Sequence, residues 1–373
     1  MTGPHLNAPR LTALVETLPS AVPFVGPEAQ ERSRGRPFKA RIGANENVFG
    51  PSPIAVEAMC AAAAEAWKYG DPENHDLKQA LARRHDVAPQ NIVVGEGIDG
   101  LFGYIARMTV EPGTPVVTSL GAYPTFNFHV TGFGGKLHAA PYRNDHEDIA
   151  ALLDLARRES AKLVFLANPD NPMGTWWRAH DVAGLIKALP ASAILCLDEA
   201  YCEFAPPEAL APLDVGNPQV LRFRTFSKAY GLAGARIGYA IGEAGLIKSF
   251  DKIRNHFGVN RIAQAGALAA LSDETNLAKV IAEVAAARQT IAEIAAANGL
   301  ETLASGANFV AIDCGRDGDF ARRVLHGLIA RDIFVRMPGV APLDRCIRVS
   351  AGRPADLEAF AAALPEALKH ARA

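Results

Sequence analysis

Cysteine is scarce in this chain of 373 residues, and the five that occur include no Cys-x-x-Cys pair. Scattered cysteines in odd number fit neither a zinc site nor a disulfide framework, and they favour a reducing, cytoplasmic setting. The ten histidines form no His-x-x-x-His or His-Glu-x-x-His pair. We therefore expect no bound metal.

An excess of one charge is also missing, because 38 basic and 40 acidic residues leave a net charge of −2. Such a balance predicts no nucleic-acid partner and no attraction to acidic membranes. No stretch reaches the roughly 18 apolar residues that span a bilayer, and no basic region followed by an apolar run marks a secretory signal. With 49% hydrophobic and 21% charged residues, the composition is typical of a soluble globular protein.

The length exceeds what one hydrophobic core usually fills, so we expect more than one domain. Proline and mixed charge in residues 1–44 suggest an extended N-terminal arm. Residues 45–265 are predicted to form a large domain. Residues 266–373, completed by part of the N-terminal segment, are predicted to form a small one.

Short apolar runs alternate with helical stretches through the large domain. This order of strand, helix and strand predicts an α/β fold with a mostly parallel sheet between two layers of helices. Ligands in such sheets bind at the carboxyl ends of the strands. The expected strands lie within 91–94, 114–119, 134–141, 161–169, 192–200 and 219–226.

The pattern changes after about residue 272. A long amphipathic helix is expected from there to Asn298-Gly299, a pair typical of a helix C-terminus. Strand, helix, strand, strand and helix follow it in order. This succession predicts a smaller α+β domain.

A glycine motif, GEGIDG at residues 95–100, follows one expected strand and precedes a helix. The spacing matches the dinucleotide fingerprint, but the next strand does not end in the acidic residue that would hold a ribose. A nicotinamide oxidoreductase thus becomes a remote alternative. An anion site at the helix N-terminus fits better, while a tight turn without a ligand stays open. Asp99 is expected to help cap the helix.

Three other strand ends carry polar residues: Asn171 in NPDNPMG, Asp198 in DEAY, and Lys228 in TFSKAYGLAGARIG. Each alone has an ordinary reading as a turn, a helix cap or a solvated lysine. Their joint occurrence at successive strand ends favours a functional site.

These segments, N-P-x-N-P-x-G, D-E-A-Y and S-K-x-Y-x-L-A-G-x-R-x-G in this order, resemble the pyridoxal-phosphate enzymes of the aspartate aminotransferase fold (fold type I). Within them the chain is most similar to the histidinol-phosphate aminotransferases. NENVFGPSP at 45–53, YGDP at 69–72 and CIRVSAG at 346–352 match as well. The resemblance covers roughly residues 41–370.

The resemblance implies roles around the cofactor ring. Lys228 would form the Schiff base and move the substrate proton, because a lysine amine can do both. Asp198 would pair with the pyridinium nitrogen and keep the ring an electron sink. Tyr201 and Asn171 would hydrogen-bond the ring 3′-oxygen, and Tyr123 would stack on the ring.

It also implies a phosphate site. Ser227, Arg236 and the backbone amides of Gly97 and Ile98 would hold the cofactor phosphate. Tyr69 would reach the phosphate of a partner subunit, since active sites of this family form at a homodimer interface. The glycine motif departs from the family pattern G-x-G-S/A-D-E at Ile98, so one side-chain contact to the phosphate is lost.

For the substrate, Arg348 resembles the arginine that binds a carboxylate or phosphate, and Arg336 a second arginine for a phosphorylated side chain. Asn171 would contact the substrate too. The resemblance implies an amino transfer in two stages, from an L-amino acid or amino alcohol phosphate, best L-histidinol phosphate, to 2-oxoglutarate. A decarboxylase or oxidase with the same cofactor is an alternative, and so is a non-catalytic relative. Trp176 and Trp177 are expected to pack in the core, although a pocket wall is the alternative.

Overall fold

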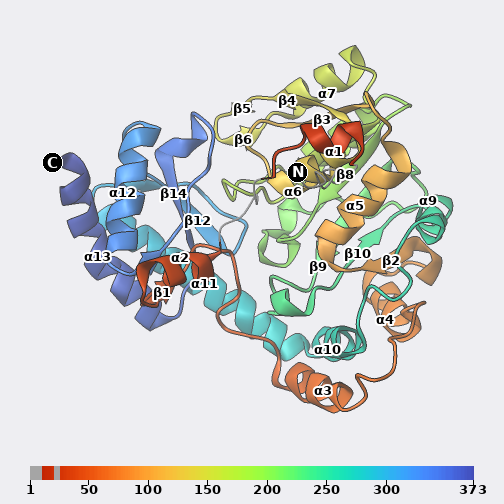
Figure 1. Ribbon diagram of the computed structural model, residues 1–373, viewed down its shortest axis with the longest axis horizontal. Coiled ribbons are helices and arrows are strands. Elements are labelled where there is room, and N and C mark those ends of the chain that lie inside the picture. The colour runs from red at the N-terminus through yellow and green to blue at the C-terminus, as the bar shows by residue number, and fades with distance from the viewer. Residues whose placement is uncertain (1–10, 21–25) are drawn as a thin grey trace, which may run out of the picture.

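A seven-stranded sheet forms the centre of the larger part of the molecule, with the order β2-β10-β9-β8-β7-β3-β4 (Figure 1). The computed structural model describes residues 11–20 and 26–373. Only β10 runs antiparallel to its two neighbours, and the other strand pairs are parallel. The mostly parallel sheet expected from the sequence is confirmed. Its strands are β2 (Ile92–Gly95), β3 (Pro115–Ser119), β4 (Lys136–Ala140), β7 (Leu163–Ala167), β8 (Ile194–Asp198), β9 (Val220–Thr225) and β10 (Gly238–Ile241).

Both faces of this sheet are covered, as strand β7 illustrates. All five of its residues are buried, and successive side chains point to opposite faces. Phe165 packs at ring-centroid distances of 5.7 Å from Phe102 and 4.8 Å from Phe126 on one face. Val164 and Leu166 join a separate apolar cluster on the other face. An unbroken apolar run therefore specifies a strand buried between two helical layers.

The helices follow the apolar stretches of the sequence. α5 and α6 supply Phe102 and Phe126 to one layer, whereas α7 and α8 pack on the opposite face. None of the helices in the described part of the chain is long and apolar enough to cross a membrane. The helices of this part are α3 (Pro53–Ala63), α4 (His75–His85), α5 (Gly97–Thr109), α6 (Pro124–Gly132), α7 (Ile149–Arg158), α8 (Ala179–Ala188), α9 (Ala244–Ser249) and α10 (Arg261–Ser272).

A smaller unit lies beside the large sheet, drawn in blue in Figure 1. The long helix α11 (Glu274–Ala297) leads into it and ends where expected, with Gly299 at a φ of 70°. An antiparallel sheet of order β11-β12-β14 packs there with two helices. Its elements are β11 (Glu301–Thr302), β12 (Phe309–Asp313), α12 (Gly318–Ala330), β14 (Cys346–Ser350) and α13 (Pro354–Arg372).

The N-terminal segment differs from the extended arm that we expected. Residues Ala13–Thr17 and Pro27–Arg34 form the short helices α1 and α2, because Thr12 caps the first and Pro27 begins the second. The predictions that fall on residues 1–10 and 21–25 lie outside the described residues. Strand β1 (Ala40–Arg41) then pairs in parallel with β13 (Ile333–Phe334), so the beginning of the chain is joined to the smaller unit.

Candidate active site

A cavity of about 280 Å³ opens at the carboxyl ends of β8 and β9 and at the N-terminus of α5. Residues of the N-terminal segment and of the smaller unit complete its wall. The structure brings ten of the twelve predicted site residues together here. They are Ile98, Tyr123, Asn171, Asp198, Tyr201, Ser227, Lys228, Arg236, Arg336 and Arg348.

Lys228 lies just past the end of β9, with its Nζ donating to the carbonyl oxygen of Asn45 at 3.1 Å. Its ammonium also lies 5.6 Å from the centre of the Tyr201 ring. Burial lowers the pKa of Lys228 to about 8, and the positive charge of Arg348 adds to this effect. The amine therefore loses its proton much more readily than a solvated lysine.

Asp198 ends strand β8 and is buried. Its carboxylate accepts a hydrogen bond from the backbone N–H of Ala200 at 2.9 Å. Burial raises the pKa of Asp198 to about 7, and the negative charge of Asp99 also raises it. A buried carboxyl group in this state favours a ligand that brings a positive charge.

One end of the cavity is suited to an anion. The helix α5 begins here, so its backbone amides and the positive end of its dipole face the space beside Arg236. The guanidinium of Arg236 donates to Ser227 Oγ at 3.4 Å. Gly97 does not line the cavity but lies against this guanidinium, with a φ of +76° and only 2.6 Å between Arg236 Nη2 and the place of a Cβ. The positive φ favours glycine at this position, and a Cβ here would displace the flexible end of Arg236.

The part of the wall that the smaller unit contributes holds two arginines on adjacent backbone segments. Arg336 and Arg348 form an antiparallel bridge, in which the N–H of Arg348 donates to the Arg336 oxygen at 2.6 Å. Arg348 Nη1 donates to Asn171 Oδ1 at 2.6 Å, while its buried Nε has no hydrogen-bond partner within the described ranges. Burial lowers the pKa of Arg348 to about 10. A desolvated guanidinium with an unused donor is suited to bind a carboxylate or phosphate.

Sequence comparison identifies the family to which this geometry belongs. The model of the family "Aminotransferase class I and II" matches residues 39–364. The chain belongs to this family. The family resemblance and the fold expected from the sequence are thereby confirmed.

Individual relatives of this aminotransferase carry a more specific name. The chain is 32% identical over 369 residues to the histidinol-phosphate aminotransferase of Moorella thermoacetica, and the alignment covers 98% of this chain and 95% of the relative. Identity to the enzyme of that name from Anaeromyxobacter sp. is 37% over 327 residues, covering 86% and 89%. The crystal structure of histidinol-phosphate aminotransferase from Sinorhizobium meliloti in complex with pyridoxal-5′-phosphate is 56% identical. It has a TM-score of 0.95 and covers 97% of this chain and 98% of that one.

Among the cavity residues that sequence reasoning about the aminotransferase missed, Asn45 and Asp99 contact predicted site residues. Asn45, expected only as part of a matching segment, is buried and donates through Nδ2 to the Tyr201 hydroxyl at 3.0 Å. Asn171 Nδ2 donates to the same hydroxyl at 3.4 Å. Asp99, expected to cap a helix, instead lines the cavity and accepts from Tyr123 Oη at 3.0 Å. The NENVFGPSP segment was the available signal for Asn45, and the Asp of the family pattern G-x-G-S/A-D-E was the signal for Asp99.

Tyr69 lies outside the cavity of its own chain. Its ring is 75% exposed and lies 4.5 Å from that of Phe257, itself half exposed. Trp67 nearby is exposed as well. The tryptophans of the NPMGTWW segment, by contrast, do not line the cavity: Trp177 packs against the apolar cluster under α7 and α8 and donates through Nε1 to the Glu147 oxygen at 2.8 Å.

Proposed function

We propose that this aminotransferase moves the amino group of L-histidinol phosphate to 2-oxoglutarate. The observation that carries the proposal is the position of Arg336 and Arg348 in one cavity with Lys228. Two guanidiniums at one end of the cavity favour a donor that carries an anionic group, in addition to the dicarboxylate acceptor. The names of the 56% identical structure and of the curated relatives support this donor.

The cofactor is pyridoxal 5′-phosphate, and the residues present fit it. Lys228 offers a readily deprotonated amine for its aldehyde, and buried Asp198 offers a counter-charge for its ring nitrogen. For its phosphate, the N-terminus of α5, Ser227 and Arg236 form an anion site that lies on the same cavity. We assign the amides of Gly97 and Ile98 to that phosphate as well.

The remaining roles concern orientation and proton movement. When bound, the cofactor supplies a carbonyl carbon for amino exchange and a ring that accepts electrons. We assign Tyr201 and Asn171 to the ring 3′-oxygen, and Tyr123 to the ring face. Lys228 then holds and moves the proton of the substrate α-carbon, for which a pKa of about 8 is suited. Arg348 orients the substrate carboxylate or phosphate, and Arg336 binds the phosphorylated side chain.

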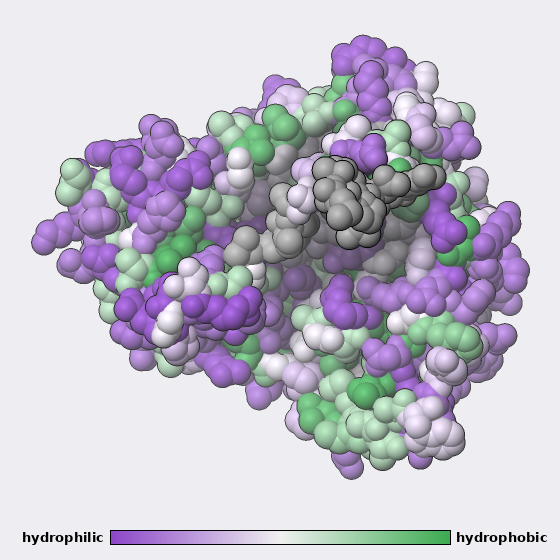
Figure 2. All heavy atoms as spheres, in the orientation of Figure 1, coloured by the Kyte–Doolittle hydropathy of each residue, from purple (hydrophilic) through white to green (hydrophobic). Residues whose placement is uncertain are grey.

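We further propose that the enzyme works as a homodimer with shared active sites. Apolar side chains gather over α3 (Figure 2), where Ile54 and Val56 are 44% and 42% exposed. Trp67, Tyr69 and Phe257 add exposed aromatic surface, and contiguous exposed apolar surface marks an interaction site. In such a dimer Tyr69 would reach the cofactor phosphate of the partner subunit. A cytoplasmic location stays a prediction, in keeping with five free cysteines.

A screen of amino donors with 2-oxoglutarate and the holoenzyme tests this function. We expect glutamate to form, with the highest kcat/KM for L-histidinol phosphate. Arg336→Ala should reduce kcat/KM for phosphorylated donors much more than for unphosphorylated amino acids. If the enzyme releases only carbon dioxide or peroxide, the proposed transfer is wrong and a decarboxylase or oxidase replaces it. Equal losses for both classes of donor would remove the reason for a phosphate ester.

A further inference from the structure

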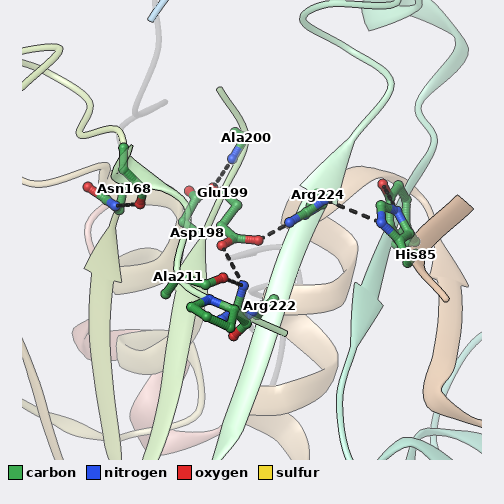
Figure 3. Close-up of polar contacts among 11 residues, drawn as sticks. His85, Asn168, Asp198, Glu199, Ala200, Ala211, Arg222 and Arg224 are labelled. Carbon is green, nitrogen blue, oxygen red and sulfur yellow. Dashed lines mark hydrogen bonds and ion pairs between the residues drawn. The ribbon is translucent and has the colours of Figure 1, made fainter. Parts of the chain in front are cut away.

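A buried ionic cluster lies directly behind Asp198 (Figure 3). The carboxylate of Glu199 accepts from Arg222 Nη1 at 3.2 Å and from Arg224 Nε at 2.8 Å. The side chains of Glu199 and Arg222 are 3% exposed, and that of Arg224 is 15% exposed. One carboxylate thus holds two guanidiniums away from bulk solvent.

The cluster connects the two strands that carry the proposed chemistry. Glu199 directly follows Asp198 at the end of β8, and β9 continues through Thr225 toward Lys228. Arg222 and Arg224 are two residues apart on β9, so their side chains lie on one face of the sheet. The backbone N–H of Glu199 also donates to the Phe223 oxygen at 2.8 Å. Backbone and side chain of Glu199 therefore both hold β9 against β8.

The outer end of the cluster is closed by neutral partners. Arg224 Nη1 lies 3.5 Å from His85 Nδ1, and His85 Nε2 lies 2.9 Å from the Tyr239 hydroxyl. Burial and the charge of Arg224 lower the pKa of His85 to about 3. Since arginine only donates, His85 accepts at Nδ1 and carries its proton on Nε2. Glu203, the other acid near Arg224, is half-buried, and the burial of its carboxyl group raises its pKa.

We propose that Glu199 is a positioning residue for the cofactor. It fixes β8 against β9, so that Asp198 and Lys228 stand at a set separation. Its negative charge also offsets the positive charges of Arg222 and Arg224 behind Asp198. This inference rests on the proposed roles of Asp198 and Lys228 toward pyridoxal phosphate. Glu199 itself does not line the cavity, so it acts through its neighbours.

A charge-swap series tests the proposal in the holoenzyme: Glu199→Gln, Arg224→Gln and the double variant. The main measurement is the pH at which the visible absorbance of the bound cofactor changes. Glu199→Gln leaves the two guanidiniums unbalanced, which disfavours the protonated cofactor and moves this pH down by about one unit. Arg224→Gln removes a positive charge and moves it up. The double variant restores the charge sum, and we expect the transition to return close to that of the unmodified enzyme.

Binding of pyridoxal phosphate to the apoprotein is the second measurement, in which both single variants should bind more weakly. Arg34→Gln is the matched control, because Arg34 is 16% exposed and shares Asp332 with Arg36, and none of these three residues lines the cavity. It should leave both readouts unchanged. If Glu199→Gln does not fold, Arg224→Gln alone carries the charge test, and Arg224→Lys, which retains the charge, should keep the transition near its original pH.

Three results would overturn the inference in different ways. A coloured unmodified enzyme whose transition stays fixed in every variant refutes the positioning role alone. Equal losses of stability with no opposite shifts, and no recovery in the double variant, show a purely structural cluster and refute it too. An unmodified protein that binds no pyridoxal phosphate overturns the proposed function and this inference together.

Discussion

Replacement of Gly97 by alanine tests the proposed phosphate site of the cofactor, and a control variant distinguishes this effect from a loss of fold stability. The alanine Cβ would lie 2.6 Å from Arg236 Nη2, so the guanidinium must move away from the N-terminus of α5. A φ of +76° adds strain of about 1–2 kcal/mol for a residue with a Cβ. We therefore expect a less stable protein that also binds pyridoxal phosphate more weakly.

The expected loss of affinity follows from the contact that is displaced. A hydrogen bond to a charged group contributes about 1.5–3 kcal/mol. Because 1.4 kcal/mol corresponds to tenfold in a dissociation constant, the Kd of the cofactor should rise about 10- to 150-fold. Titration of the apoprotein with pyridoxal phosphate, followed by absorbance, measures this Kd, and thermal unfolding of the apoprotein measures the strain.

Gly113→Ala is the matched control. Gly113 has a φ of +89°, but a Cβ there meets no atom within 4 Å, and the residue does not line the cavity. Both variants should lose similar stability, while only Gly97→Ala should lose affinity. Equal cofactor Kd values for the two variants would refute the assignment of Arg236 to the phosphate.

Three further outcomes follow from the site. A pKa of about 8 for Lys228 predicts that the apoprotein takes up the cofactor faster as the pH rises through 8, since only the neutral amine attacks an aldehyde. Stopped-flow absorbance measures this rate. A rate that still rises beyond pH 9, as for an ordinary lysine with a pKa of about 10.4, contradicts the prediction. Arg348→Lys replaces a planar guanidinium by a single ammonium and loses the hydrogen bond to Asn171. We expect kcat/KM to fall about tenfold or more for glutamate and for the phosphorylated donor alike. Unchanged values of kcat/KM would exclude Arg348 from substrate binding. Tyr69→Phe should weaken cofactor binding without changing the sedimentation mass of the proposed dimer. Trp67→Phe, at a second exposed aromatic residue, should leave the Kd of the cofactor unchanged. Equal Kd values for the two variants would exclude Tyr69 from the partner's site.

The sequence predicts the centre of the fold well because its strands are unbroken apolar runs. The position of β7, with five buried residues, can be predicted from its apolar run in the sequence alone. β10 escapes notice, since four residues that begin with glycine give no such run. The β1–β13 pair is hidden for another reason: two-residue strands almost 300 positions apart leave no local pattern. The helix α2 was obscured by the surrounding prolines.

Prediction of the site follows the same division. Asn171, Asp198 and Lys228 stand at strand ends, where parallel topology brings side chains together, so local motifs suffice. Asn45 and Asp99 lie within matching motifs, but their contacts with Tyr201 and Tyr123 join segments distant in the sequence, so no local pattern gave their roles. The role expected of Tyr69 requires a second subunit, and it therefore stays a prediction.

The hydrogen bond between Asn45 and strand β14 affects the order in which parts of this enzyme can fold during synthesis. The backbone N–H of Asn45 donates to Ser350 Oγ at 3.0 Å, and Ser350 donates its own backbone N–H to Ile42 at 2.7 Å. More than 300 residues must be synthesised between these partners. The nascent chain can therefore form its large sheet early and still lack a finished active site. A chain that ends before β14 lacks the partner that holds Asn45 beside the Tyr201 hydroxyl.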